Sequence, residues 1–368
     1  MSNTQDVLII GGGPAGLAAA LALRQHGMTV TVADSFAPPI DKPCGEGLMP
    51  DGVAALARLG VHLPPTEGFA FRGIRFVSGD QSVAAGFPIG RAIGARRTVL
   101  HDAMVKQAEC AGVHFLWRSV VSAWSRDGAM VNGKLFRARW FVGADGSASR
   151  VRRWAGLDRH LCKHRRFAYR RHYRIAPWSD FMELHWGPGC QLYITPVARE
   201  EICVVLISQS PQLRLDQALS AFPEVHQRLK NCDISSVERG AESVTRKLAR
   251  VCAGNVALIG DSSGGVDAIT GEGLCLAFKQ AEVLATSLQT GNLRTYQSAH
   301  RRLAIRPSNM ARLMLLLENR EWLRRRTMQA FERRPQLFAG MLATHVGSST
   351  PLDIATNGLA LGWRVLTA

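Results

Sequence analysis

Residues 6–34 read DVLIIGGGPAGLAAALALRQHGMTVTVAD and determine the fold of the N-terminal part. An apolar run ends at Gly11, an alanine- and leucine-rich helical segment follows, and a second apolar run ends at Asp34. In such a unit Gly11 permits a tight turn, Gly13 lets a pyrophosphate approach the backbone, and Gly16 lets helix and strand pack closely. An acidic residue about 20 positions further on binds a ribose hydroxyl. The stretch therefore predicts a dinucleotide-binding βαβ unit, with Asp34 as its acidic residue.

Two further glycine-rich segments lie far along the chain. They are GADGSASRVR at residues 143–152 and GDSSGGVDAITGEGL at residues 260–274. Apolar, strand-like runs at residues 140–144 and 255–259 lead into them. At the end of a parallel strand, such a turn presents backbone N–H groups to a phosphate or a ribityl chain. The three glycine-rich turns together predict a flavoprotein.

Length and composition indicate a large folded protein with an anionic partner. The chain has 368 residues, of which 46% are hydrophobic, so we expect a large core and two interleaved domains. Its formal net charge of +16 favours a phosphorylated cofactor, an acidic acyl carrier or CoA thioester, or a lipid headgroup. Nucleic acid suits this charge less well, and we expect no nucleic-acid partner.

The cysteines and the N-terminus indicate a cytoplasmic protein. The eight cysteines include no C-x-x-C pair and no zinc-ligand spacing, which is typical of reduced thiols without a metal site. The first ten residues lack the basic and apolar regions of a signal peptide. No apolar run reaches the roughly 18 residues of a membrane span. We expect any membrane contact to be peripheral, at the inner face.

The middle of the chain changes from alternating strands and helices to successive strands. Strand-like runs separated by proline, glycine and charged turns occur at residues 167–175, 181–186, 192–197 and 202–207. This pattern predicts an antiparallel sheet inserted into the first domain. Before it, turns at Asp127-Gly128 and Asn132-Gly133 predict a small antiparallel sheet.

The first of these runs interleaves aromatic and basic residues. Phe167, Tyr169, Arg171 and Tyr173 fall on one face, and Ala168, Arg170, His172 and Arg174 fall on the other. We expect the basic residues to lie on a solvated outer face.

The C-terminal part is helical and basic. An apolar run at residues 313–317 lies beside several arginines. We expect a helix that packs on the core and exposes a basic face. Contact with an anionic membrane or an acidic protein surface is the alternative.

The three turns, in this order and spacing, resemble those of the flavoprotein superfamily that contains p-hydroxybenzoate hydroxylase and the geranylgeranyl reductases. The resemblance runs from the first strand to about residue 285 and implies an FAD cofactor, with NAD(P)H as a transient reductant. It implies that Arg97, in an Arg-x-x-Leu helix start, contacts FAD, and that the carboxylate of Asp261 holds the ribityl chain. The implied FAD-binding residues are Gly11, Gly13, Pro14, Ala15, Gly16, Asp34, Ser35, Cys44, Gly45, Arg97, Asp145, Gly146, Arg152, Gly260, Asp261, Gly271, Glu272, Gly273 and Leu274.

The expected fold is therefore α/β. It comprises a Rossmann-like FAD-binding domain of the glutathione-reductase type, an inserted antiparallel substrate domain, and a C-terminal helical region. The FAD-binding domain is predicted at residues 1–75, 95–160 and 245–295, the substrate domain at residues 76–94 and 161–244, and the helical region at residues 296–368.

Two segments indicate a particular group of proteins within the superfamily. KPCGEGLMP at residues 42–50 and TGEGL at residues 270–274 are similar to segments of geranylgeranyl and menaquinone-side-chain reductases. Those reductases usually carry a Tyr-x-Trp-x-Phe-Pro segment, but residues 193–196 here read Tyr-Ile-Thr-Pro, and Ala268 replaces a common proline. The Trp-x-Trp-x-Ile-Pro segment of flavin-dependent halogenases does not occur in the chain.

Three functions are compatible with these patterns. The favoured one is a monooxygenase that hydroxylates or epoxidises an apolar or aromatic small molecule through a flavin C4a-hydroperoxide, with the substrate between the flavin and residues 181–197. The second is a reductase of isoprenoid or acyl C=C bonds, with Cys44 as proton donor or, alternatively, as a packing residue. The third is a binding protein that has lost catalysis. His185 and Glu272 are acid–base candidates, although a strand histidine and a helix-start carboxylate also have purely structural uses.

Overall fold

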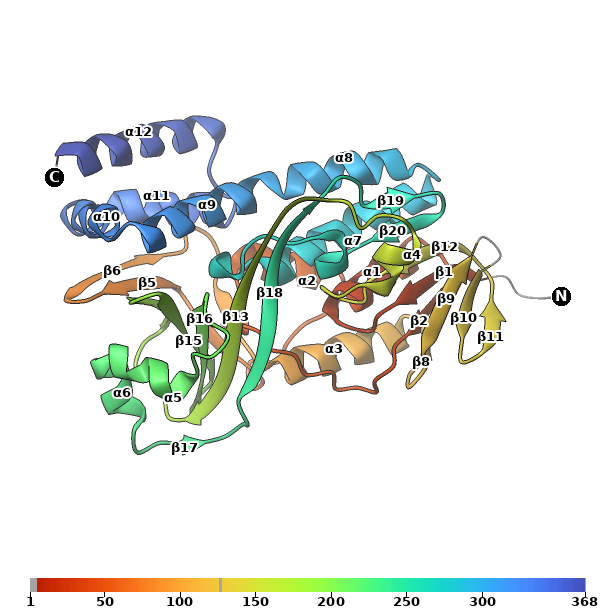
Figure 1. The fold of residues 1–368 in the computed structure, drawn as a ribbon, viewed down its shortest axis with the longest axis horizontal. Helices are drawn as coiled ribbons and strands as arrows, with labels where there is room; N and C mark the ends of the chain where they lie inside the picture. The colour runs from red at the N-terminus through yellow and green to blue at the C-terminus, as the bar shows by residue number, and fades with distance from the viewer. Residues whose placement is uncertain (1–4, 126–127, 368) are drawn as a thin grey trace.

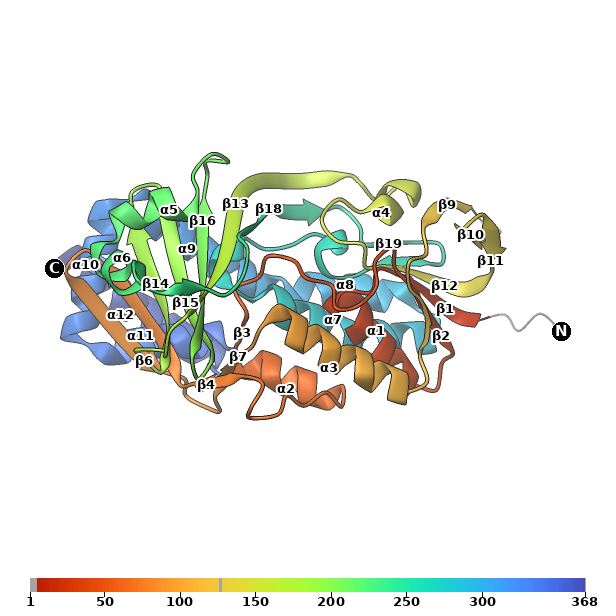
Figure 2. The same ribbon diagram turned by 90° about the horizontal axis from the view of Figure 1, so that it is seen from below.

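The computed structural model describes residues 5–125 and 128–367. The molecule is elongated, with the first strands near one end and the last helix at the other (Figure 1). A long pair of strands in the middle of the molecule connects the two halves (Figures 1 and 2). The predicted turn at Asp127 falls outside the described residues.

A mostly parallel sheet forms the first half. In spatial order its strands are β19 (Cys252–Ala253), β20 (Val256–Leu258), β12 (Ala138–Gly143), β1 (Gln5–Ile10), β2 (Val30–Ala33) and β8 (His114–Leu116). Val7, Leu8 and Ile9 of the central strand β1 are fully buried, because both faces of a parallel sheet are covered. The helices of this half are α1 (Pro14–Gln25), α2 (Pro50–Arg58), α3 (Arg97–Cys110), α4 (Arg150–Trp154), α7 (Gly273–Gln289) and α8 (Leu293–Leu303).

Two small antiparallel sheets accompany this half. One contains β11 (Lys134–Phe136), β10 (Gly128–Val131) and β9 (Val121–Ser125), which confirms the small sheet predicted around Asn132-Gly133. The other contains β3 (Gly47–Leu48), β7 (Ala92–Gly94) and β4 (Phe69–Phe71). The second sheet places the segment around Cys44 beside the large sheet of the other half.

The second half is built on a larger, mostly antiparallel sheet. In spatial order its strands are β17 (Asp233–Ile234), β13 (His160–Arg174), β16 (Glu201–Ser208), β15 (Cys190–Ala198), β14 (Phe181–Gly187), β5 (Gly73–Ser78) and β6 (Gln81–Gly86), and β18 (Arg239–Leu248) also pairs with β13. The four runs predicted in this region correspond to β13 through β16. The β5–β14 pair is the parallel exception.

Helices cover both faces of this sheet. On one face lie α5 (Leu215–Ala218) and α6 (Pro223–Leu229), and on the other lie α9 (Ile305–Asn319), α10 (Glu321–Arg333), α11 (Pro335–His345) and α12 (Pro351–Thr367). Met314 and Leu317 of α9 are buried against the sheet, as predicted for the run at residues 313–317. None of the helices in the described part of the chain has the length and apolar character that crossing a bilayer requires.

Candidate functional site

The three glycine-rich turns meet at the carboxyl ends of β1, β12 and β20. The Ala144 amide donates a hydrogen bond to the Ile10 carbonyl at 2.8 Å, which joins the first turn to the second. A Cβ added to Gly260 would lie 2.6 Å from the Ala15 Cβ, so the third turn touches the first. A long cofactor could therefore contact all three turns at once.

The first turn is shaped by its glycines. A Cβ on Gly16 would lie 1.9 Å from the Gly11 carbonyl oxygen, because α1 packs tightly on the turn. At Gly13, by contrast, the nearest atom is Arg97 Nη2, 3.9 Å away. Asp34 Oδ2 accepts a hydrogen bond from the Gly12 amide at 2.7 Å. The backbone at Gly13 is thus open to a ligand, next to a guanidinium group.

Hydrogen bonds and an ion pair fix the conformation of the second turn. The Asp145 carboxylate accepts hydrogen bonds from Ser149 Oγ and the Arg150 amide, at 2.5 and 2.7 Å. Arg152 is buried, donates to the Ser262 carbonyl at 3.0 Å and pairs with Asp158 at 2.5 Å. These bonds give Asp145 and Arg152 structural roles, and their contact with FAD stays a prediction.

The third turn leaves its carboxylate exposed. The Gly260 amide donates to Gln280 Oε1 at 2.9 Å, and Ser262 Oγ donates to the Gly143 carbonyl, so the turn is held on both sides. Asp261 itself is exposed between these anchored residues. A carboxylate in this position is available to a hydroxyl group of a ligand.

We expect Asp261→Ala to weaken FAD binding by more than tenfold. The variant would remove the predicted charge-assisted hydrogen bond to the ribityl chain, which would contribute about 1.5–3 kcal/mol. Flavin fluorescence titration of the apoprotein measures the effect. Asp102→Ala, which removes an exposed carboxylate on α3, serves as control. Equal FAD affinity of the Asp261 variant and the wild type would contradict the assigned role.

A buried ion cluster holds the segment around Cys44 against β13. Glu46 is 3% exposed and has a φ of 57°. Its Oε1 accepts from Arg170 Nη1 at 2.7 Å and from the Arg97 amide at 3.0 Å, while its Oε2 lies 2.6 Å from His172 Nε2. Arg170 also pairs with Asp41 at 2.9 Å.

The expectation of a solvated basic face on β13 was therefore wrong. Arg170 and His172 are 2% and 1% exposed, and Arg171 on the other face is 9% exposed and paired with Asp216 and Glu238. Arg174 alone of the four basic residues is exposed. Acidic residues that are distant in sequence cover the strand, and the local sequence pattern around residue 170 does not indicate that they do.

Cys44 lies on this segment, and burial raises the pKa of its thiol. The thiol sulfur accepts a hydrogen bond from the Glu46 amide at 3.4 Å. The next carbonyl, that of Gly45, accepts from Thr195 Oγ1 of β15 at 2.8 Å. Cys44 is thus protonated at neutral pH, and its segment is fixed to the large sheet by the Gly45–Thr195 hydrogen bond.

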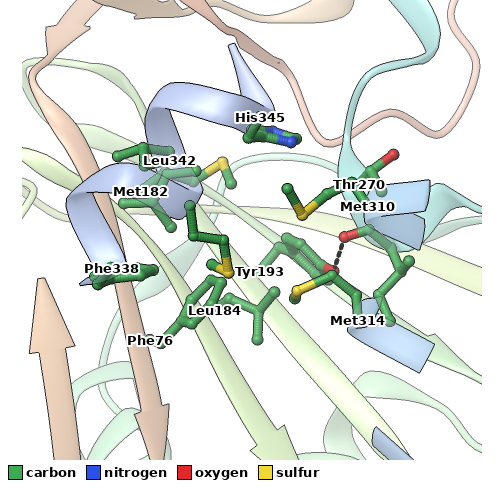
Figure 3. A pocket seen from close by; sticks show the side chains of 13 residues that line it. Phe76, Met182, Leu184, Tyr193, Thr270, Met310, Met314, Phe338, Leu342 and His345 are labelled. Carbon is green, nitrogen blue, oxygen red and sulfur yellow. Dashed lines mark hydrogen bonds between the residues drawn. The ribbon is translucent and has the colours of Figure 1, made fainter. Parts of the chain in front are cut away.

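An apolar cavity lies between the large sheet and the C-terminal helices (Figure 3). Met182, Met310, Met314 and Met341 are among its lining residues, and Ile269 and Thr270 of the third glycine-rich segment form part of its wall. Its free volume is only about 30 Å³, so a substrate requires the methionine side chains to move, which their flexibility permits. Its sheet side includes Met182, Leu184 and Tyr193, which fall within the stretch 181–197 that was predicted to face the substrate, whereas a contribution of the C-terminal helices was not predicted.

Three polar side chains reach the cavity: Tyr193, Thr270 and His345. The Tyr193 hydroxyl donates to the Ile269 carbonyl at 2.6 Å, and burial raises its pKa. Burial lowers the pKa of His345 to about 4. At neutral pH Tyr193 therefore keeps its proton and His345 is neutral.

The structure places the two acid–base candidates, His185 and Glu272, on opposite sides of the large sheet. His185 packs against Phe222 on the opposite face of the sheet from the cavity and lies 3.0 Å from Glu183 Oε2. Glu272 is 3% exposed, and its Oε2 lies 3.5 Å from Nδ1 of the cavity residue His345. Burial raises the pKa of Glu272 to about 7, although Arg306 opposes the shift.

FAD fits the open positions of this region. A Cβ added to Gly45, Gly271 or Gly273 would meet no atom within 4 Å, so the backbone there is accessible. Arg97 is 9% exposed, and its buried Nε has no hydrogen-bond partner among the described residues. The Arg97 guanidinium beside Gly13 suits the pyrophosphate, and the carboxylate of Asp261 suits the ribityl hydroxyls.

Comparisons with known proteins show what this chain resembles. The FAD binding domain family matches residues 4–169. The menaquinone reductase of Mycobacterium tuberculosis is 27% identical, over 80% of this chain and 78% of its own. The digeranylgeranylglycerophospholipid reductase of Thermoplasma volcanium is also 27% identical, over 75% of each chain.

The fold has a close structural counterpart. A flavoprotein/dehydrogenase of Cytophaga hutchinsonii superposes with a TM-score of 0.83 at 17% identity, covering 99% of this chain and 98% of the other. The chain therefore carries an FAD binding domain at residues 4–169, and it is similar to the superfamily of FAD-dependent oxidoreductases that includes the geranylgeranyl reductases and the p-hydroxybenzoate hydroxylase type of flavin monooxygenase.

Proposed function

We propose that the protein is an FAD-dependent monooxygenase that uses NAD(P)H and oxygen to hydroxylate or epoxidise an apolar or aromatic small molecule. The observation that carries the substrate class is the apolar, methionine-lined cavity next to residues 269–270 of the third glycine-rich segment. Bound FAD would supply electron transfer and oxygen activation. The chain's own residues would bind the substrate in the cavity, orient it and exclude water.

The chemistry of the cavity lining supports oxygenation. Reduction of a C=C bond requires an acid near the double bond, whereas the Tyr193 proton is held by the Ile269 carbonyl and His345 is neutral. A neutral imidazole can instead accept a hydrogen bond or a proton from a hydroxyl-bearing substrate. We therefore favour a substrate with an apolar body and a hydroxyl group.

A C=C reductase is the second candidate. It is supported by the reductase names of the two relatives and by the segments at residues 42–50 and 270–274. In that case the protonated thiol of Cys44 would be the proton donor. The substrate would be an isoprenoid or acyl chain, carried by an acidic protein or embedded in a membrane surface.

One experiment separates these functions. With NAD(P)H and a panel of phenolic, polyketide and polyprenyl compounds, we expect substrate-stimulated oxygen consumption and an oxygenated product, and no product without oxygen. Oxygen electrode traces and mass spectrometry measure both. Anaerobic formation of a product with two added hydrogens would replace the monooxygenase by the reductase. A colourless protein that takes up no FAD would instead indicate a binding protein.

A further inference from the structure

A buried acid–base pair adjoins the polar end of the cavity. We propose that Glu272 and His345 form a proton-transfer pair that receives the hydroxyl group of an apolar substrate and takes up its proton. This inference rests on the proposed function for its reaction, but the pair is defined by contacts that do not depend on it. His345 is the residue that would contact substrate, and Glu272 would act through His345.

The pair consists of two buried polar groups that face each other. His345 Nδ1 lies 3.5 Å from Glu272 Oε2, and the two side chains are 8% and 3% exposed. Neither this nitrogen nor either oxygen of Glu272 has a hydrogen-bond partner among the described residues. Buried polar atoms are normally hydrogen-bonded, so buried atoms without a hydrogen bond beside a ligand cavity suggest a functional role. His345 also lines the cavity (Figure 3).

Charged groups connect the pair to the surface. Arg306 Nη2 lies 3.2 Å from Glu272 Oε1 and 3.1 Å from Asp51 Oδ2, and Lys279 Nζ lies 2.5 Å from the same Asp51 oxygen. The side chains of Arg306 and Lys279 are 25% and 24% exposed. Protons can therefore exchange with solvent on the side of Glu272 that faces away from the cavity.

The protonation states suit a transfer at neutral pH. Burial and Asp51 raise the pKa of Glu272 while Arg306 and Lys279 lower it, and the result is about 7. Burial and Arg306 lower the pKa of His345 to about 4 while Asp51 raises it, so the imidazole stays neutral. A neutral imidazole has one donor and one acceptor nitrogen, and the state of Glu272 decides which is which.

The step is a proton transfer without redox change. When Glu272 is ionised, His345 donates its Nδ1 proton toward the carboxylate and presents Nε2 as an acceptor. The substrate O–H bond breaks, its proton goes to Nε2, and the Nδ1 proton passes to Glu272. The negative charge moves from the carboxylate to the substrate oxygen, which makes the substrate a better nucleophile for oxygenation.

Binding of 4-hexylphenol to the FAD-loaded protein tests the pair. This probe does not itself titrate between about pH 5.5 and about pH 8.5, because phenols ionise near pH 10. We expect its Kd to fall by about tenfold as pH rises, with a midpoint near 7, since ionised Glu272 makes Nε2 an acceptor. Isothermal titration calorimetry measures Kd, and the flavin spectrum verifies loading and folding.

Matched variants assign the midpoint to this pair. Glu272→Gln and His345→Gln should each abolish the pH midpoint in Kd. Glu183→Gln and His185→Gln, which alter the buried pair on the opposite face of the sheet, should retain it. A midpoint that persists in Glu272→Gln, a pH-independent wild-type Kd, or no binding of 4-hexylphenol would each overturn the proposal. A titrating Kd without oxygen consumption would instead refute the monooxygenase and leave the pair intact.

Discussion

Gly16→Ala is expected to abolish FAD binding and to destabilise the FAD-binding half by about 3 kcal/mol or more. The added Cβ would lie 1.9 Å from the Gly11 carbonyl oxygen and 3.3 Å from the Ala144 Cβ. The first of these neighbours is backbone, which cannot rotate away as a long side chain can. The helix α1 must therefore move off the first glycine-rich turn, and this movement would disrupt the backbone that is predicted to contact the cofactor.

Two measurements check this expectation. Flavin titration should show at least a hundredfold loss of affinity, and denaturant unfolding should show a lower free energy of unfolding. Gly358→Ala is the matched control, because its Cβ would meet no atom within 4 Å on the exposed helix α12. We expect that control to be neutral or slightly stabilising. A Gly16→Ala variant that binds FAD like the wild type would show that α1 does not pack as described.

Glu46→Ala is the second variant with a large expected effect. It leaves the buried side chains of Arg170 and His172 without the carboxylate that both contact, at 2.7 and 2.6 Å. Removing one partner of a buried ion pair typically costs about 3–5 kcal/mol, because the remaining charge stays buried. The value for Glu46 should lie near the lower limit, since Arg170 keeps its bonds to Asp41.

The loss should also affect the cofactor site. Glu46 fixes the segment that carries Cys44 and accepts a bond from the Arg97 amide at 3.0 Å, so we expect weaker FAD binding as well. Chemical unfolding and flavin titration measure the two effects. Glu282→Ala, which breaks the solvent-exposed pair with Arg58, should change stability by less than about 1 kcal/mol. An equally small effect of Glu46→Ala would rule out this cluster as an anchor.

Local sequence patterns were sufficient to predict the structure of the FAD-binding half. The glycine spacing in residues 11–16 follows from one close contact between α1 and its preceding turn, which lies within the segment itself. The strand runs are apolar because a parallel sheet is covered on both faces. For these reasons the βαβ unit, the three glycine-rich turns and the FAD cofactor were predictable from short stretches of chain.

The Glu46 cluster and the cavity were decided by tertiary structure. Alternation in β13 indicates two faces, but it does not say that Glu46, about 125 residues earlier, covers Arg170 and His172. The cavity joins β14 and β15 to α9 and α11, and its histidine comes from position 345.

The sequence by itself thus determined the cofactor and the class of fold, because the glycine-rich turns and the strand and helix patterns that indicate them are each contained in a short stretch of chain. Only the folded chain decided which charges are buried, which residues line the cavity, and that Glu272 lies 3.5 Å from His345. Burial and pKa depend on what distant segments bring to a position, and residue type and spacing do not encode that information locally.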